Sequence, residues 1–243
     1  MNLVVDIGNS RTKFSLFSKG KVIITVPVSE LLPEHIILLK NEHPLLNKAI
    51  LSSVREYPDS LKETLQNNFD TFLELNHQTL LPVENMYLSK ETLGNDRIAA
   101  AVGANNLYRN TNLLVIDAGT ALTYDFVNDK NQYLGGNIAP GLEMRFKSLH
   151  YFTGKLPLVE AQSQNKLYGS TTEEAILAGV QNGFIYEVDK TIEMFNVFYG
   201  NLKVIITGGN ANFFDKELKK PFFVHSNLVA QGLNSILEYN ENK

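Results

Sequence analysis

Val4-Val5-Asp6-Ile7-Gly8-Asn9-Ser10-Arg11-Thr12-Lys13 decides the fold of this chain, because it occurs a second time in altered form. The second copy is Val115-Ile116-Asp117-Ala118-Gly119-Thr120-Ala121-Leu122-Thr123-Tyr124. Each copy has an apolar, β-branched run, then Asp, one further residue and Gly, with a Thr four residues after the Gly. The run predicts a buried strand, and the Gly permits a tight reversal of the chain.

The chemistry of such a turn points to phosphate. Its backbone N–H groups can bind phosphate oxygens, and the Asp at the end of the strand points the same way. A single Asp-x-Gly also has a purely local explanation as a turn, but its recurrence in register favours the phosphate interpretation. Two such loops facing each other would bind a polyphosphate and magnesium, which predicts a nucleotide-dependent phosphotransferase. Asp6 and Asp117 would then hold magnesium through water, while Lys13 is either a phosphate contact or a solvated lysine at a strand end.

The rest of the chain extends this repeat into an α/β fold. Apolar runs and turn residues predict the order strand, strand, strand, helix, strand, helix, given twice. We therefore expect two similar lobes, each a βββαβαβα unit, on either side of a cleft. The N-terminal lobe would span residues 1–111 and carry the first phosphate loop. The C-terminal lobe would span 112–243 and carry the second.

Composition limits the class of protein. The chain has 243 residues, 44% hydrophobic and 20% charged, which is typical of a soluble globular protein of one large or two ordinary domains. The net charge is −4 and no stretch of sequence gathers Lys and Arg, so the chain lacks the extended basic surface typical of nucleic-acid-binding proteins. A local groove that binds nucleic acid stays an open alternative. The absence of Cys excludes disulfides, thiolate zinc sites and cysteine nucleophiles. No apolar run is long enough to cross a membrane, so we expect a cytoplasmic protein.

A non-repeated element, Gly94-Asn95-Asp96-Arg97, precedes an almost wholly apolar helix. Asn95 is the expected N-cap, with Asp96 in the first turn, where the helix dipole favours an ionised carboxylate. Such a carboxylate can accept the proton of an attacking hydroxyl late in phosphoryl transfer. The guanidinium of Arg97 can bind a carboxylate or phosphate through two parallel hydrogen bonds. The alternative is an ordinary start of a surface helix.

Two further segments have a predicted place. Ser170 and Glu173 have the spacing of a capping box and should open a long helix that stops at Gly200. Thr207-Gly208-Gly209-Asn210-Ala211 follows a buried strand, where its glycines either admit an adenine ring or form a plain turn. The five histidines show no metal-ligand spacing, and neither a Walker A sequence nor a dinucleotide fingerprint occurs.

Taken together, these motifs resemble the type III pantothenate kinases of the acetate kinase, sugar kinase, heat-shock chaperone and actin superfamily. The resemblance covers essentially the whole chain, and Gly94-Asn95-Asp96-Arg97 is the element that separates this family from its relatives. The motifs that carry it, in chain order, are Asp6 to Lys13, Gly94 to Arg97, Asp117 to Thr120, Gly135-Gly136-Asn137-Ile138-Ala139-Pro140-Gly141, and Thr207 to Ala211.

The resemblance implies two ribonuclease-H-like lobes and ATP-dependent phosphorylation of the primary hydroxyl of pantothenate to 4'-phosphopantothenate, the first step of coenzyme A synthesis. Asp96 would be the proton acceptor, and Asp117 would hold a monovalent cation, K⁺ or NH₄⁺, beside Mg²⁺-ATP. The ATP contacts implied are Asp6, Ile7, Gly8, Asn9, Ser10, Arg11, Thr12, Lys13 and Thr120. The pantothenate contacts implied are Tyr87, Gly94, Asn95, Asp96, Arg97 and Thr172.

The family also implies a homodimer, for which the long helix offers a surface. Ser10 stands where Thr is common in the family, but the hydroxyl is kept. Two other functions stay open: a non-catalytic accessory or regulatory protein on the same fold, and another small-molecule kinase or a phosphatase of the superfamily.

Overall fold

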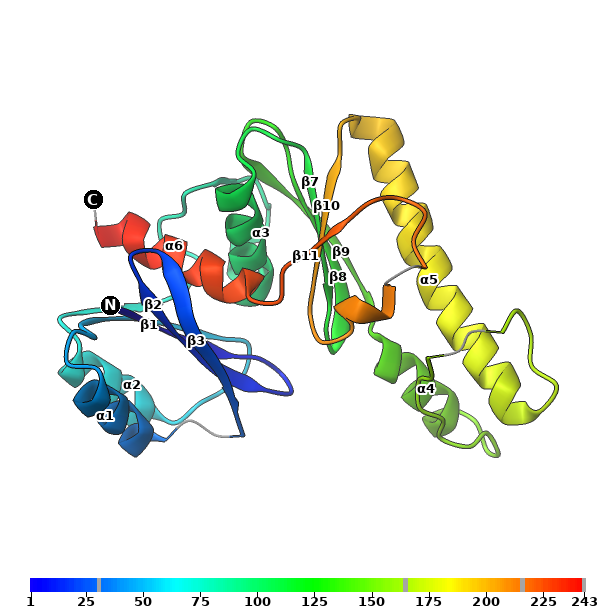
Figure 1. Ribbon diagram of the computed structural model, residues 1–243, viewed down its shortest axis with the longest axis horizontal. Coiled ribbons are helices and arrows are strands. Elements are labelled where there is room, and N and C mark those ends of the chain that lie inside the picture. Colours follow the sequence, from blue (N-terminus) through cyan, green and yellow to red (C-terminus); the bar gives the residue numbers. More distant parts are fainter. Residues whose placement is uncertain (30–31, 164–165, 215–216, 242–243) are drawn as a thin grey trace. The chain divides into compact units, whose positions relative to one another are not determined.

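The computed structural model describes residues 1–29, 32–163, 166–214 and 217–241 (Figure 1). The chain forms two compact units. Unit 1 contains Met1–Arg109, Asn131–Leu134 and Asn227–Lys243, and unit 2 contains Asn110–Lys130 and Gly135–Ser226. The C-terminal helix therefore belongs to unit 1. The division of the chain into lobes of 1–111 and 112–243 stays a prediction.

Unit 1 is built on a five-stranded sheet whose order is β3-β2-β1-β4-β5. The three successive strands predicted at the start of the chain form an antiparallel meander, β1 to β3, while β4 and β5 run parallel to β1. The strands are β1 (Asn2–Ile7), β2 (Thr12–Ser18), β3 (Lys21–Val28), β4 (Lys48–Ser53) and β5 (Thr71–Glu74). The helices of this unit are α1 (Pro33–Glu42), α2 (Asp59–Asn68), α3 (Asn95–Leu107) and α6 (Leu228–Glu241), with a 3-10 turn η1 (Lys90–Thr92).

Alternation along β1 gives the sheet two different faces. Leu3, Val5 and Ile7 lie in a buried cluster with α1 and α2. The opposite face meets α6 (Figure 1). There the Asn2 amide donates to Asn234 Oδ1 over 2.8 Å. Asp6 lies on this second face, the face that α6 and α3 cover.

Helices α3 and α6 pack together closely because two glycines remove side chains from their contact. A Cβ on Gly103 would overlap with the backbone of Leu228, and a Cβ on Gly232 would overlap with the Ala99 carbonyl. Apolar residues and Gly103 make up the middle of α3, from Ile98 to Ala104, and this whole segment is buried. This packing holds α3 in place and so positions the residues at its N-terminus.

Unit 2 repeats the topology of unit 1. Its strands are β7 (Leu113–Ala118), β8 (Ala121–Val127), β9 (Gln132–Pro140), β10 (Lys203–Thr207) and β11 (Phe223–Val224), in the order β11-β10-β7-β8-β9. Numbered within each unit, both sheets have the order third, second, first, fourth, fifth. The short β6 (Glu84–Asn85) adds a sixth strand by pairing with the first two residues of β9, within unit 1. The expected α/β duplication is confirmed.

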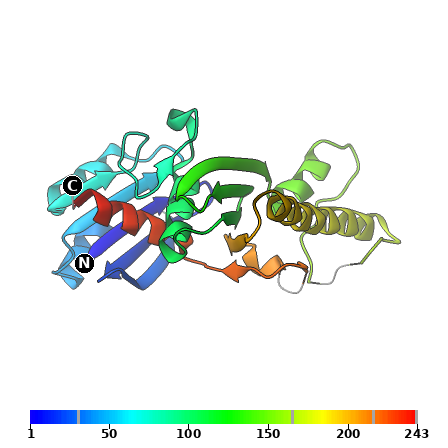
Figure 2. The ribbon, with the colours of Figure 1, turned by 90° about the horizontal axis from the view of Figure 1, so that it is seen from above.

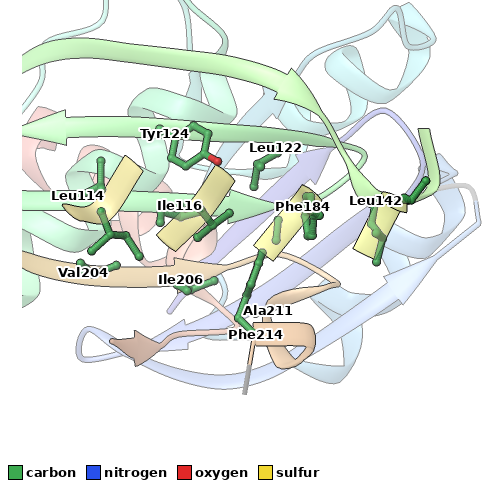
Figure 3. Packing of buried hydrophobic residues seen from close by; sticks show 14 of the residues in the cluster. Leu114, Ile116, Leu122, Tyr124, Leu142, Phe184, Val204, Ile206, Ala211 and Phe214 are labelled. Atoms are coloured by element: carbon green, nitrogen blue, oxygen red, sulfur yellow. The ribbon is translucent and has the colours of Figure 1, made fainter. Parts of the chain in front are cut away.

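The helices of unit 2 depart from strict repetition. Two helices, α4 (Leu142–Tyr151) and α5 (Thr172–Tyr199), precede β10, and they lie side by side (Figure 2). Between β10 and β11 the described residues contain a 3-10 turn, η2 (Ala211–Phe214), and no α-helix. The core of this unit joins Leu114 and Ile116 of β7 to Phe184 of α5, with Phe214 stacked on Phe184 at 5.0 Å between ring centroids (Figure 3).

The ends of α5 test the predicted helix signals. Gly200 stops the helix as expected, with φ of +59°. The predicted capping box at Ser170 and Glu173 is wrong by one residue: Thr171 is the N-cap and accepts from Glu174 N, while the Glu174 carboxylate accepts from Ser170 N. Two adjacent Thr and two adjacent Glu residues made both registers possible. No helix in the described ranges is both long and apolar enough to cross a bilayer.

Candidate active site

The first phosphate loop is a hairpin between β1 and β2. Gly8 N donates to Arg11 O over 3.0 Å and closes the turn, and a Cβ on Gly8 would lie 3.1 Å from the same oxygen. Asn9, Ser10 and Arg11 are exposed, whereas Ile7 and Thr12 are buried at its base. Across the hairpin Asp6 pairs with Lys13, so both side chains lie on one face of the sheet.

Arg55, which follows β4, forms hydrogen bonds to this loop. The sequence did not predict this contact. Arg55 Nε donates to Gly8 O over 3.1 Å, and its Nη2 donates to Thr12 Oγ1 over 3.2 Å. Ser53 Oγ in turn binds both the N–H and the carbonyl of Arg55. One guanidinium therefore fixes both ends of the loop. Only the fold brings Arg55 there, since it lies 47 residues from Gly8.

Helix α3 begins at the same edge of the sheet. The expected N-cap is wrong: Gly94 is the N-cap, and the Asn95 amide instead donates to Ser53 O at 3.3 Å and to Leu75 O at 3.0 Å. Ser53 is the last residue of β4 and Leu75 follows β5, so Asn95 links the start of the helix to the sheet. Gly94 leaves room for Asp96, whose Oδ1 would lie 2.7 Å from a Cβ there.

The charges of Asp6, Asp96 and Lys13 act on one another within unit 1. The pKa of Asp6 is raised to about 6, chiefly by burial and in addition by the negative charge of Asp96, while the positive charge of Lys13 opposes the rise. Asp96 is half-buried, and its Oδ1 accepts from Arg97 N over 2.8 Å. The hairpin and the start of α3 thus place two carboxylates and a lysine in one electrostatic cluster, as a site for a hydrated cation and phosphate requires.

The expected pantothenate contacts of unit 1 also gather here. The guanidinium of Arg97 lies over the Tyr87 ring, 5.8 Å from its centroid, and Tyr87 packs at 6.1 Å from Tyr133. Arg97 is 6% exposed. Tyr87 follows β6, so the pairing of β6 with β9 positions its ring. Of the predicted contacts, Tyr87, Gly94, Asn95, Asp96 and Arg97 lie in unit 1, and Thr172 lies in unit 2.

The second loop is a tighter hairpin of unit 2. Gly119 N donates to Ala121 O over 3.1 Å, and Asp117 pairs across the hairpin with Thr123. The first loop is one residue longer, because there Ile7 pairs with Thr12, whereas Ala118 pairs with Leu122. In space Thr123 therefore corresponds to Lys13, and the lysine that faces Asp6 has no counterpart opposite Asp117.

Two other glycine motifs meet this second loop. Gly208 has φ of +93°, and a Cβ on it would overlap with Asp117 Oδ1 and the Ala118 backbone. Gly141, at the end of the Gly135–Gly141 motif, leaves similar room for the Gly119 and Thr120 carbonyls. Asn210 N donates to Ala118 O over 2.9 Å, and its amide donates to the Glu143 carboxylate over 3.0 Å. Three motifs far apart in sequence thus form one site around Asp117.

The glycines of the 207–211 segment differ in their role. Gly208 is required by its positive φ and by its close packing on Asp117, whereas a Cβ on Gly209 would meet nothing within 4 Å. A turn of the backbone is therefore enough to explain why Gly stands at position 208. The adenine interpretation of the open space at Gly209 stays a prediction.

Thr172 is the first residue of α5 and lines a groove of unit 2 between α4 and α5. The groove has a volume of about 660 Å³ and is lined by Arg145 and by small residues of α5, among them Gly179 and Gly183. A Cβ on either glycine would meet nothing within 4 Å, so the groove continues along the helix.

The two aspartates differ in what they could bind. No group of three or more His, Asp or Glu side chains is arranged for a metal in the described part of the chain. Beside Asp6, Ser52 Oγ is buried without a hydrogen-bond partner among the described residues, which fits a cation that keeps its water. Around Asp117, Gly208 and Gly119 leave the carboxylate in a cradle that a Cβ would fill, beside the Ala118 carbonyl. The carboxylate and carbonyl oxygens gathered there could serve as ligands of a cation.

Comparison with solved structures identifies the fold class. The chain aligns over 98% of its length with a glucokinase from an Antarctic psychrotroph, at a TM-score of 0.58 and 14% identity, which shows the fold alone. A protein of a Baf family of transcriptional activators from Campylobacter jejuni aligns over 99% of the chain and 100% of its own, at a TM-score of 0.64 and 26% identity. The chain therefore shares its fold with these two proteins, one of which is a glucokinase.

Sequence comparison gives the family. The profile of the type III pantothenate kinases matches residues 2–194. A type III pantothenate kinase of Cytophaga hutchinsonii is 44% identical, covering 99% of this chain and 100% of its own, and one of Phocaeicola vulgatus is 42% identical, covering 99% of each. The chain belongs to the type III pantothenate kinase family, and this family consists of phosphotransferases.

Proposed function

We propose that this protein transfers the γ-phosphoryl group of ATP to the primary hydroxyl of pantothenate, giving 4'-phosphopantothenate and ADP. The observation that carries the proposal is the cluster at the edge of the unit 1 sheet. There Asp96 stands at the start of α3 and interacts with Asp6, which pairs with Lys13. The full-length similarity to type III pantothenate kinases supports pantothenate as the acceptor.

In the proposed reaction the pantothenate hydroxyl oxygen attacks the γ-phosphorus in line. A new O–P bond forms as the bond to the ADP oxygen breaks, and Asp96 accepts the hydroxyl proton. This proton becomes acidic only late in a loose transition state, so a carboxylate is a sufficient base. The ring of Tyr87 and the guanidinium of Arg97 would orient the acceptor, because an Arg fork matches the pantothenate carboxylate.

The first loop would hold the phosphates through its backbone N–H groups and Lys13. Asp6 would hold magnesium through water, and the ion when bound would neutralise charge developing on the phosphate oxygens. Asp117, in its cradle of glycines, would hold K⁺ or NH₄⁺, with Thr120 as a second ATP contact. Thr172 would contact pantothenate from the groove on unit 2.

A homodimer is part of the proposal. Helix α5 exposes several large apolar side chains in its second half, and such exposed apolar surface often marks a contact with another protein. They are Tyr186, Met194, Val197, Phe198 and Tyr199. A second copy of the chain would cover them. Sedimentation of a monomer at micromolar concentration would count against this interface.

The test is an ATP-dependent assay against pantothenate and a panel of hydroxylated metabolites, with magnesium and potassium each withheld in turn. Asp96→Asn should lower kcat about 10²- to 10⁴-fold, the usual contribution of a general base. It should leave ATP affinity within about twofold, since the amide keeps its size. Glu91→Gln, an exposed acid in η1, is the matched control and should keep full turnover. Normal turnover by Asp96→Asn would exclude its role as proton acceptor.

A non-catalytic regulatory protein is the second candidate, because the Campylobacter jejuni relative carries the name of a transcriptional activator. The two functions separate by mass spectrometry. A thermal shift with pantothenate but no phosphorylated product would favour the regulatory role. Turnover of another metabolite in the panel in place of pantothenate would favour a different small-molecule kinase.

A further inference from the structure

Ser52 is a buried hydroxyl that the fold places beside the first phosphate loop without giving it a partner. It lies near the end of β4 and is 1% exposed. Its Oγ makes no hydrogen bond to any described residue. A buried hydroxyl without a partner loses its hydration and gains nothing in return, so such groups are rare and call for an explanation.

The sheet register gives the position of this hydroxyl. Asp6 pairs with Ser52 on β4 and with Lys13 on β2. The three residues therefore form one row across three adjacent strands, with their side chains on the same face. This is the face that α6 and α3 cover, and Asn95 of α3 bonds to the carbonyl of the next residue, Ser53. Ser52 thus belongs to the same corner of unit 1 as Asp6 and the start of α3.

The neighbouring hydroxyls show what an ordinary structural role looks like in this sheet. Thr12 Oγ1 accepts from Arg55, Ser53 Oγ bonds to the Arg55 backbone, and Ser15 Oγ bonds to Thr25 Oγ1 at 2.9 Å. Ser15 is as buried as Ser52, at 1% exposure, and lies on the same face two residues from Lys13. The absence of a partner therefore distinguishes Ser52 from the hydroxyls around it.

We propose that Ser52 Oγ is a positioning group for the hydrated magnesium ion that accompanies ATP, an inference that rests on the proposed function. Side chains on adjacent strands in one row have Cβ atoms about 5 Å apart, and Ser52 Oγ makes no hydrogen bond to Asp6 across this interval. A water molecule fits that interval. Magnesium keeps several of its waters in proteins, and a metal-bound water is a strong donor. Ser52 Oγ accepts from one such water while Asp6 accepts from another.

This role makes opposite predictions for stability and for binding. Ser52→Ala removes an unpartnered buried hydroxyl, so the ligand-free protein should keep or raise its Tm. The same change should weaken magnesium-ATP binding about tenfold, as the loss of one hydrogen bond to a charged partner does, and leave binding of metal-free ATP unchanged. Ser15→Ala, which breaks an existing bond, should lower the Tm and leave both affinities unchanged.

The experiment is calorimetric titration of ATP with and without magnesium into wild type, Ser52→Ala, Ser52→Thr and Ser15→Ala, with a thermal melt of each ligand-free protein. Ser52→Thr keeps the hydroxyl and should recover most of the magnesium-dependent affinity. Equal weakening with and without magnesium, or no weakening, would overturn the proposal, and so would a lower Tm for Ser52→Ala. If wild type itself binds ATP without regard to magnesium, the proposed function fails at that step, independently of any Ser52 variant.

Discussion

Asp6→Asn is the substitution whose effect follows most directly from the structure. Burial and the neighbouring Asp96 raise the pKa of Asp6 from an ordinary 3.8 to about 6. A raised carboxyl pKa means that the folded protein holds this proton more tightly than the unfolded chain. The group therefore favours the folded state below about pH 4, and this contribution is lost as the pH rises through 6.

The size of the effect can be worked out from the same shift. A difference of about 2.2 pKa units corresponds to about 3 kcal/mol, and part exposure of the side chain to solvent reduces this to about 2 kcal/mol. At pH 8 Asp6→Asn, which cannot ionise, should therefore raise the free energy of unfolding of the ligand-free protein by about 2 kcal/mol. Near pH 4 the difference between variant and wild type should be close to zero.

The assay is urea unfolding of both proteins at intervals from pH 4 to pH 8, followed by circular dichroism. Asp70→Asn, an exposed change in the same unit, is the control and should stay within about 0.5 kcal/mol at every pH. The gain in stability should come with a loss of magnesium-ATP binding, since the ion loses its carboxylate. A difference between Asp6→Asn and wild type that does not change with pH, or a less stable variant at pH 8, would refute the reasoning.

Two further substitutions test the loops themselves. Arg55→Met removes both donors that hold Gly8 O and Thr12 Oγ1, so ATP affinity measured by titration should fall about tenfold. Arg55→Lys should recover little, because one ammonium cannot replace the fork, and full affinity in Arg55→Met would show that the loop holds its shape alone. Gly208→Ala should cost about 1–3 kcal/mol in urea unfolding and weaken the response of turnover to potassium, owing to its positive φ and its contact with Asp117. Gly209→Ala, which points into open space, is the control and should change neither.

The sequence predicted the parts of the fold that depend on local pattern. Alternating and β-branched runs identified the meander, and the recurrence of the Asp-x-Gly hairpin predicted two units of one topology. It did not predict that α6 joins unit 1, because this depends on Gly103 and Gly232, which look like ordinary helix interruptions until the two helices are seen together. The N-caps predicted at Asn95 and Ser170 were wrong for different reasons. The Asn95 amide bonds to carbonyls of the sheet, which leaves Gly94 as the N-cap, whereas at Ser170 the adjacent Thr171 could cap the helix equally well.

The candidate site was predictable for residues inside a motif and hidden for residues outside one. Asp6, Lys13 and Asp96 stand in recognisable sequence contexts, and the structure brings them together in unit 1. Arg55 and Ser52 carry no local signal. Their relation to the first loop comes from the parallel pairing of β1 with β4, which joins residues more than 40 positions apart. A parallel pair always requires such a crossover, so side chains contributed by the second strand escape any short sequence window.

The two phosphate loops look alike in sequence because both copies have a Thr four residues after the Gly, but the pairing of the strands shows that these threonines do not correspond. The longer first hairpin places Thr12 opposite Ile7 and Lys13 opposite Asp6, while the tighter second hairpin places Thr123 opposite Asp117. One extra residue in the turn thus gives the first aspartate a lysine and the second a hydroxyl. Under the proposed function the first loop would bind phosphate with a divalent ion and the second a monovalent cation. The difference in loop length would then account for that division between two copies of one motif.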